Sequence, residues 1–257
     1  MPRPPETTIF ASVSSGRPPL TGGCDEEIVA FFNLVENDSN PTLPLNWNVA
    51  PTNEIYIVKN ENRENADRKL DTASWGLIAP WQKNFNEARA GQSHAINARS
   101  ESIHEKPTFR DAFRTSRCLI PVTGYYDWAT SLGKYPPKQP FYITSETGSP
   151  LSIAGIFSTW RSESGIEIQS ASIITQEAVG ELATIHSRMP VFMTRDRWEE
   201  WLDPKNREIH HLQGMMKSEN PTAGLITRPV SPRVNIVANN GPEIIDLYEL
   251  GEPETLF

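Results

Sequence analysis

The residue types suited to proton transfer and anion binding are concentrated in a few short stretches of this 257-residue chain. Asn97 and Arg99 are separated by one residue, and the same spacing separates His186 from Arg188. Side chains at this spacing share one face of an extended strand. Asp127 adds a carboxylate at the end of an apolar stretch. An amide, a carboxylate, an imidazole and two guanidinium groups could bind an anionic substrate and move protons.

Each of these side chains also has an ordinary structural explanation. A histidine such as His186 is more often a packed, hydrogen-bonded residue than a catalyst. Asn97 could cap backbone groups, and Asp127 could begin a turn. Taken one at a time, these residues favour the structural interpretation.

The charge distribution gives a second indication. The whole chain carries a formal charge of −8, which argues against a nucleic-acid partner. Residues 81–117, however, hold seven basic and four acidic residues, a local balance of +3 that leaves −11 for the rest. Aromatic residues such as Trp81, Phe109 and Trp128 lie in or near this segment. This mixture is typical of a groove for single-stranded nucleic acid, although an ordinary solvated helix over 108–117 explains the charges equally well.

Composition narrows the class of protein. Mean hydropathy is −0.47, and no apolar run approaches the roughly 18 to 20 residues of a membrane helix. The amino-terminal residues lack the apolar core of a secretory signal, so we expect an intracellular protein without membrane contact, in the cytoplasm or nucleoid or in a nucleus. The two cysteines, Cys24 and Cys118, do not predict a zinc site or a disulfide framework. We expect no bound metal and no cofactor.

Strands dominate the predicted elements. Alternating or continuous apolar stretches predict strands at 9–13, 54–58, 72–77, 118–127, 141–144, 151–157, 169–175, 191–193 and 235–237. Apolar residues at helical spacing predict helices from 25 to about 37–40 and at 108–115, 194–202 and 207–216. Two polar segments, 60–69 and 83–92, are predicted to be surface loops.

The connections between these strands are mostly too short for repeated βαβ crossovers. We therefore predict a single compact α+β domain with an antiparallel, barrel-like β core and peripheral short helices. Residues 1–23 would form an amino-terminal extension with a first strand, and residues 24–250 would form the domain.

Six ordered motifs resemble those of the SRAP family, the SOS response-associated peptidases or abasic-site processing proteins. They cover about residues 46–246 and read N-V-A-P-T, W-G-L-I-A-P-W, I-N-A-R-S-E, F-R-x-A-F with R-C-L-I-P-x-x-G-Y-Y-D-W, I-H-S-R-M-P and S-P-R-V-N-x-V-x-N-x-G-P. The resemblance implies a protein that binds single-stranded DNA beside an abasic site, and we expect a monomer. It also implies a cross-link between the protein and the sugar aldehyde, and an autopeptidase-type activity.

The resemblance assigns roles to individual residues. Asn97, Asp127 and His186 match the catalytic positions of the family. The positions matched to DNA binding are Arg99, Arg188, Asn48, Pro51 and Trp128.

Two positions depart from the family pattern. Family members begin Met-Cys-Gly-Arg, and their terminal Cys forms a thiazolidine with the sugar, whereas Thr7 aligns with that Cys in this sequence. Asp127 stands where the family has Glu, which withdraws the carboxylate by about 1.5 Å. A misplacement of this order can slow a positioned step on the order of 100-fold.

These departures leave alternatives open. The chain could be a catalytically impaired single-stranded-DNA-binding module of the same fold. A wrongly assigned start would restore a terminal Cys, and an exposed Pro2 amine could form an iminium with an aldehyde. A cysteine hydrolase using Cys24 or Cys118 with His186 is the last alternative.

Overall fold

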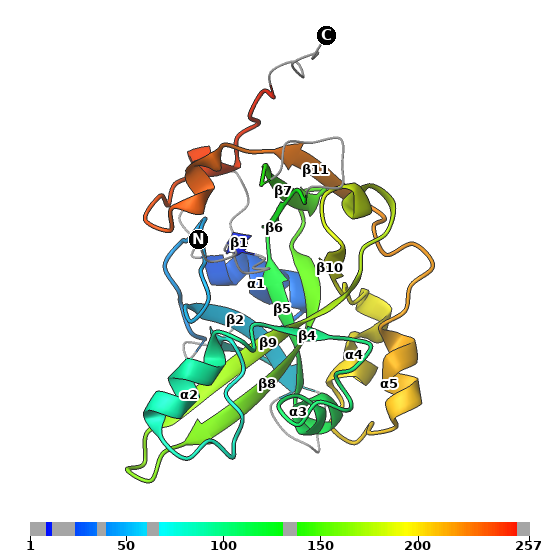
Figure 1. Ribbon diagram of the computed structural model, residues 1–257. Helices are drawn as coiled ribbons and strands as arrows, with labels where there is room; N and C mark the ends of the chain where they lie inside the picture. Colours follow the sequence, from blue (N-terminus) through cyan, green and yellow to red (C-terminus); the bar gives the residue numbers. More distant parts are fainter. Residues whose placement is uncertain (1–8, 12–23, 35–39, 61–66, 131–137, 251–257) are drawn as a thin grey trace.

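The computed structural model describes residues 9–11, 24–34, 40–60, 67–130 and 138–250, with the backbone alone at 9–11, 24 and 25. Two β-sheets form its centre, and short helices cover their surfaces (Figure 1). None of the helices within these residues is long and apolar enough to span a membrane.

Five strands close into a barrel. They are β2 (Glu54–Asn60), β3 (Arg68–Trp75), β5 (Arg117–Val122), β8 (Leu151–Arg161) and β9 (Glu167–Glu177). Their order is β9-β3-β2-β5-β8, and β8 pairs back with β9. The predicted barrel-like core is thus confirmed. Its pairings are antiparallel except at the β3–β9 seam, which is parallel.

The second sheet contains β1 (Ile9–Ala11), β6 (Gly124–Trp128), β7 (Pro140–Ser145) and β11 (Leu225–Pro229), in the order β1-β6-β7-β11. The predicted strand 118–127 is therefore two strands, β5 in the barrel and β6 in this sheet. Gly124 begins β6 against Tyr142, whose ring would lie 2.4 Å from a Cβ atom at that position. A residue without a side chain allows this close approach.

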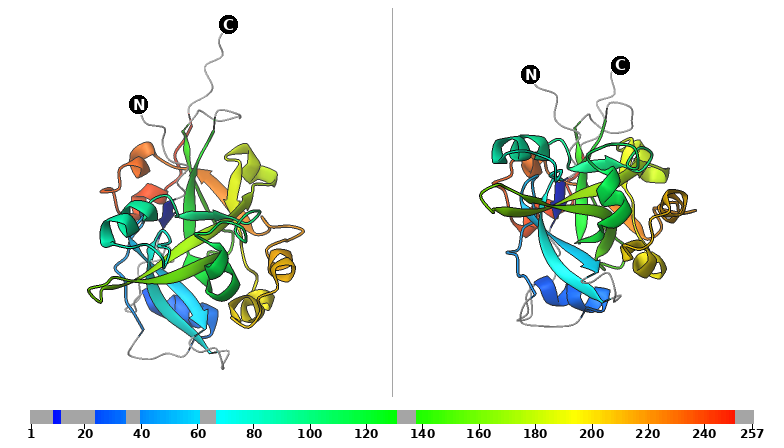
Figure 2. Two further views of the ribbon diagram at one scale, coloured as in Figure 1. Left: turned by 60° about the horizontal axis from the view of Figure 1, so that its bottom comes forward. Right: turned by 90° about the horizontal axis from the view of Figure 1, so that it is seen from below.

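Five α-helices lie around the sheets: α1 (Cys24–Phe32), α2 (Phe85–Gln92), α3 (Arg110–Thr115), α4 (Trp198–Leu202) and α5 (Ile209–Met215). Four 3₁₀ helices accompany them: η1 (Gly180–Thr184), η2 (Arg195–Arg197), η3 (Pro232–Asn235) and η4 (Pro242–Ile245). Figure 2 shows α1 at one end of the barrel, with α4 and α5 together on one side.

Two large apolar clusters hold these parts together. One joins barrel residues such as Val58 to α1, α3, α4 and α5, with Phe32 stacked on Trp198 at 4.5 Å between ring centroids. The other joins barrel residues such as Ile57 to Tyr125 and Ile143 of the second sheet. Both faces of the barrel strands are therefore buried, which explains their long apolar runs.

Several predicted elements were wrong in type or length. Residues 83–92 were predicted to be a loop, but α2 begins at Phe85 because the Asn84 side chain accepts the Glu87 N–H at 2.9 Å. The strand predicted at 235–237 is absent, and η3 occupies residues 232–235.

Other boundaries also differ. α1 ends at Phe32, and the positive φ of Asn33 terminates it. β11 was not predicted, and the strand predicted at 191–193 lies instead at β10 (Arg188–Pro190), leaving one isolated bridge at Phe192. Part of the predicted loop 60–69 belongs to β3, which begins at Arg68, and residues 61–66 lie outside the described chain.

Candidate active site

The carboxyl half of β9 places two of the predicted segments side by side. β4 (Asn97–Arg99) runs parallel to it, with Arg99 paired to Thr175, and β10 runs antiparallel, with Pro190 paired to the same Thr175. The two short strands therefore lie on opposite edges of β9. Asn97 and Arg99 are in extended backbone, as predicted, whereas His186 lies just before β10.

Asp127 and His186 form the centre of the site. Asp127 is the second-last residue of β6, and the Thr130 N–H donates to the Ile185 carbonyl at 2.9 Å, which brings the end of β6 to the segment before His186. His186 Nδ1 lies 3.6 Å from Asp127 Oδ2, and these side chains are 13% and 11% exposed. Asp127 and His186 are 59 positions apart in the sequence, so only the tertiary structure brings them together.

The surroundings of this pair determine the pKa of the Asp127 carboxyl. Burial raises the pKa of the Asp127 carboxyl to about 7, although His186 and the Trp128 N–H both favour the carboxylate. That N–H donates to Asp127 Oδ1 at 2.9 Å, and the Arg188 N–H donates to His186 Nδ1 at 3.2 Å. Asp127 can therefore exist as an acid or as a base near neutral pH, which suits general acid–base catalysis.

Arg188 is held by an acid that sequence reasoning did not assign. Its Nη1 and Nη2 donate to Glu101 Oε1 and Oε2 at 2.7 and 2.9 Å, and Nη2 also donates to the Thr175 carbonyl at 2.7 Å. The hydrogen bond from Arg188 lowers the pKa of the Glu101 carboxyl. Glu101 and Thr175 thus fix the guanidinium of Arg188, while Arg99 is exposed on β4.

The buried polar atoms without a hydrogen-bond partner in the described chain include Asn97 Oδ1 and Arg188 Nε. One is an acceptor and the other is a donor. Buried groups of this kind are costly unless a ligand or water completes them. They are therefore suited to contact a bound molecule.

Asn48 is placed differently from the expectation. It is only 1% exposed, and its Nδ2 donates to the carbonyls of Val234, Ile236 and Asn239 at 3.0 to 3.1 Å. Its amide is thus used to pin the loop 234–239. A direct contact between Asn48 and DNA would require this loop to move.

The same loop reaches Trp128. The Trp128 Nε1 donates to Asn235 Oδ1 at 2.7 Å, so the partly exposed indole has a fixed orientation. Pro51 lies in the turn before β2, where Thr52 has a positive φ of 73°. Asn48 and Trp128, which lie in different sequence motifs, are therefore both hydrogen-bonded to this loop.

The cysteines and Thr7 add no nucleophile to the described site. Thr7 and Pro2 lie outside the described residues, and the Cys24 side chain is likewise not described. Cys118 is fully buried in β5, and burial raises the pKa of its thiol well above the ordinary value, which excludes the thiolate needed by a cysteine hydrolase. Among the described residues, no three His, Cys, Asp or Glu side chains are grouped to hold a metal.

Sequence reasoning missed Glu101 and Asn235 as parts of the site. Both occur in the motifs that suggested the family, two residues after Arg99 and in the late S-P-R-V-N stretch. Their places in these motifs were the available signal. Their partners, Arg188 and Trp128, are distant in sequence and could not be inferred from spacing.

The fold and the site define a single-domain α+β protein with a five-stranded barrel, in which Asp127 of the second sheet meets His186 in an acid–imidazole pair. The family model described as SOS response associated peptidase (SRAP) matches residues 16–237. The chain belongs to this SRAP family.

Curated relatives extend the match along most of the chain. The abasic site processing protein YoaM of Bacillus subtilis is 34% identical over 221 residues, which cover 86% of this chain and 93% of YoaM. The abasic site processing protein YoqW of the same organism is 32% identical over 227 residues, covering 87% and 95%. The abasic site processing protein HMCES of Rattus norvegicus is 30% identical over 223 residues, covering 76% of this chain and 62% of HMCES.

Solved structures show the same fold. A protein from Bacteroides thetaiotaomicron matches with a TM-score of 0.69 and 25% identity, covering 79% of this chain and 86% of that one. A protein from Bordetella bronchiseptica matches with a TM-score of 0.67 and 22% identity, covering 87% and 99%.

Proposed function

We propose that this protein processes abasic sites in single-stranded DNA by forming a covalent link to the open sugar, with Asn97, Asp127 and His186 as its catalytic residues. The observation that carries the proposal is the buried Asp127–His186 pair at 3.6 Å. The buried Asn97 Oδ1 and Arg188 Nε, which have no hydrogen-bond partner in the described chain, support it. The relatives named as abasic site processing proteins support the choice of substrate. Such a role places the protein inside the cell with its DNA.

The chemistry requires proton transfers at two points. An abasic sugar must open from its ring form to an aldehyde, and an amine that attacks the aldehyde gives an imine with loss of water. Asp127 in its acid form donates a proton to the departing hydroxyl, and the neutral imidazole of His186 accepts one from the attacking amine. The reverse sequence releases the protein, and the same pair would serve an autopeptidase-type step.

The position of β1 supports an attacking group from the amino-terminal region. Ile9, its first residue, pairs with Tyr126, the residue directly before Asp127. The amino end of β1 therefore lies next to the acid of the site. Peptide mapping of the cross-linked product identifies the residue that carries the sugar.

The remaining proposed contacts are with the DNA strand. Arg99 and Arg188 meet phosphate groups, and the indole of Trp128 offers a face for a base. Pro51 lines the groove, and Asn48 supports it by holding the loop 234–239. A monomer suffices for this arrangement.

The test uses two oligonucleotides that differ only at one position. One carries a natural abasic site, and the other carries its tetrahydrofuran analogue, which has no aldehyde. We expect both to bind and only the natural site to give an adduct stable to heat and detergent. Binding to both oligonucleotides without any adduct would contradict the covalent step and identify the protein as a DNA-binding module. Binding to neither would overturn the whole proposal.

A further inference from the structure

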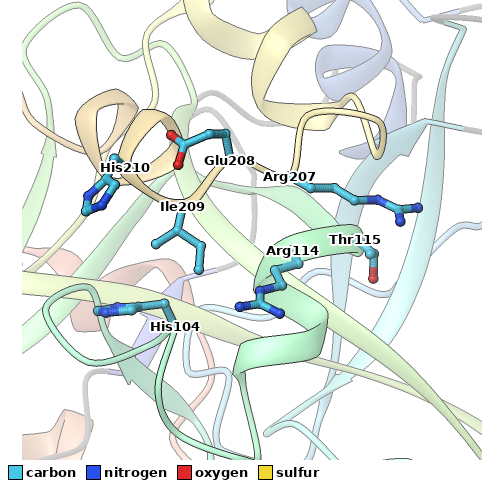
Figure 3. A pocket seen from close by; sticks show the side chains of 7 residues that line it. All are labelled: His104, Arg114, Thr115, Arg207, Glu208, Ile209 and His210. Atoms are coloured by element: carbon cyan, nitrogen blue, oxygen red, sulfur yellow. The ribbon is translucent and has the colours of Figure 1, made fainter.

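A second polar pocket lies away from the Asp127–His186 pair. Its volume is about 620 Å³, and it is formed by the loop after β4, α3 and the start of α5. Figure 3 shows His104 and Arg114 on one side, Ile209 and His210 on the other, and Arg207 beside Thr115. Two guanidinium and two imidazole groups from three chain segments thus line one hollow.

The guanidinium groups of this pocket are not neutralised within the described chain. Arg114 and Arg207 form no ion pair there, in contrast to Arg188 and Arg161, which are paired with glutamates. The Nε of Arg207 donates only to the Pro204 carbonyl, at 3.1 Å. Their charges are therefore available to an anion.

The carboxylates near the pocket are already engaged. Glu208 accepts the His211 N–H at 2.6 Å and caps α5, and this hydrogen bond lowers the pKa of its carboxyl. Glu105 lies 3.5 Å from His104 Nε2. The pocket is lined by one acidic residue, Glu208, and two arginines, so its local charge is positive although the whole chain carries −8.

A buried arginine, Arg117, accounts for the carbonyl end of α3, the helix that carries Arg114; the nearby Asp203 carboxylate favours its charged form. Arg117 is 3% exposed and donates to five backbone carbonyls, with no carboxylate among its hydrogen-bond partners. Two of these carbonyls, those of Phe113 and Arg114, belong to the last turns of α3. The negative end of that helix is therefore already compensated, and it does not cancel the charge of Arg114.

We propose that this pocket binds phosphodiester groups of the same DNA strand beyond the abasic site, and so lengthens the DNA footprint; this inference rests on the proposed function. The chain connects the two places directly. β4 carries Arg99, Glu101 follows and holds Arg188, and His104 reaches the pocket three residues later. A strand that follows this segment leaves Arg99 and next meets Arg114 and Arg207.

The test compares DNA lengths with the full chain. One single-stranded oligonucleotide of about 4 nucleotides fits the catalytic site alone, and one of about 16 nucleotides extends beyond it. We expect Arg114→Ala and Arg207→Ala each to weaken binding of the long strand up to about fivefold. Each should also lower its salt slope by about 0.7, the value for one phosphate contact on a single strand. Binding of the short strand and adduct formation on it should not change.

Arg161→Ala is the matched control, because Arg161 is an exposed arginine on the hairpin between β8 and β9. It should leave binding of both lengths unchanged. Equal losses on short and long strands, no loss on either, or the same loss in the control would overturn the pocket proposal. If the unaltered protein binds neither length, the proposed function itself fails, which separates the two results. A circular-dichroism melting curve for each variant confirms that these exposed substitutions preserve the fold.

Discussion

Asp127 carries its carboxyl group where water has little access, and this burial has opposite effects on the proposed proton transfer and on stability. A pKa near 7 keeps a transferable proton at the pH of the cell. The unfolded chain releases the same proton near pH 4. The folded state keeps this proton up to a higher pH than the unfolded chain does. The free energy of unfolding contributed by this group therefore falls as the pH rises from about 4 to about 7.

We therefore expect Asp127→Asn to abolish adduct formation and to stabilise the protein at pH 8. The amide cannot ionise, so the cost of a buried carboxylate disappears, and the gain should be about 1 to 3 kcal/mol. Urea unfolding at pH 8 and at pH 4 measures it, and the gain should be small at pH 4. A loss of stability at pH 8 would contradict the raised pKa.

Asn97 should show a similar separation of function from stability. Its Oδ1 is buried and lacks a hydrogen-bond partner in the described chain, so truncation removes a cost rather than a contact. We expect Asn97→Ala to keep or raise the melting temperature while slowing adduct formation on the order of 100-fold. A marked fall in melting temperature at unchanged rate would show that Asn97 is structural.

Residue types and the family motifs singled out Asp127 and His186 as candidates, and the structure places them 3.6 Å apart. Their catalytic roles stay a prediction. The roles of Glu101 and Asn48 could not be predicted in this way. Glu101 is assigned by a bidentate contact with Arg188 across 87 positions, and Asn48 by three carbonyls of a loop near the other end of the chain. Such contacts depend on tertiary structure, which local spacing does not encode.

At the scale of elements, Arg117 ties β5 to two helices. Its guanidinium bridges the last turns of α3 and the carbonyls of Trp201, Asp203 and Asn206 at and beyond the end of α4. Burial lowers its pKa to about 10, which still leaves the group charged at neutral pH. One side chain therefore satisfies carbonyls at the ends of two helices, α3 and α4.

We expect Arg117→Met to destabilise the fold by about 3 kcal/mol or more, because it leaves buried carbonyls without donors. Arg161→Met, on an exposed arginine, should change stability by less than about 0.5 kcal/mol. Urea unfolding of both variants at pH 7 makes the comparison. Equal, small effects would mean that water replaces Arg117 at these carbonyls.

Periodicity predicted most barrel strands because both of their faces are buried and their apolar runs are long. It failed where polar side chains determine the local structure. The side chain of Asn84 starts α2 in a polar segment. Asn48 holds the end of η3 and the loop after it, where apolar residues had suggested a strand at 235–237. β11 is short and half exposed, so it left no clear pattern.

The whole molecule shares its core between the two sheets. Tyr125, Phe141 and Ile143 of the second sheet pack in the same cluster as barrel residues such as Trp75 and Ile120. Neither sheet can expose this face without a large loss of buried apolar surface.

We therefore expect one cooperative unfolding transition. Tryptophan fluorescence reports on both sheets, because Trp128 lies in one and Trp75 in the other. Its midpoint in urea should equal that of far-ultraviolet circular dichroism if both sheets unfold together. Two separate midpoints would show that the second sheet unfolds independently of the barrel.

The parallel seam of the barrel has a consequence for biosynthesis. Ser74 of β3 pairs with Ser170 of β9, so the barrel cannot close until most of the chain has left the ribosome. His186 emerges later still, and only then can it meet Asp127. A ribosome-bound fragment that ends before residue 186 therefore contains Asp127 without His186, so the acid–imidazole pair can form only after nearly three quarters of the chain has been made.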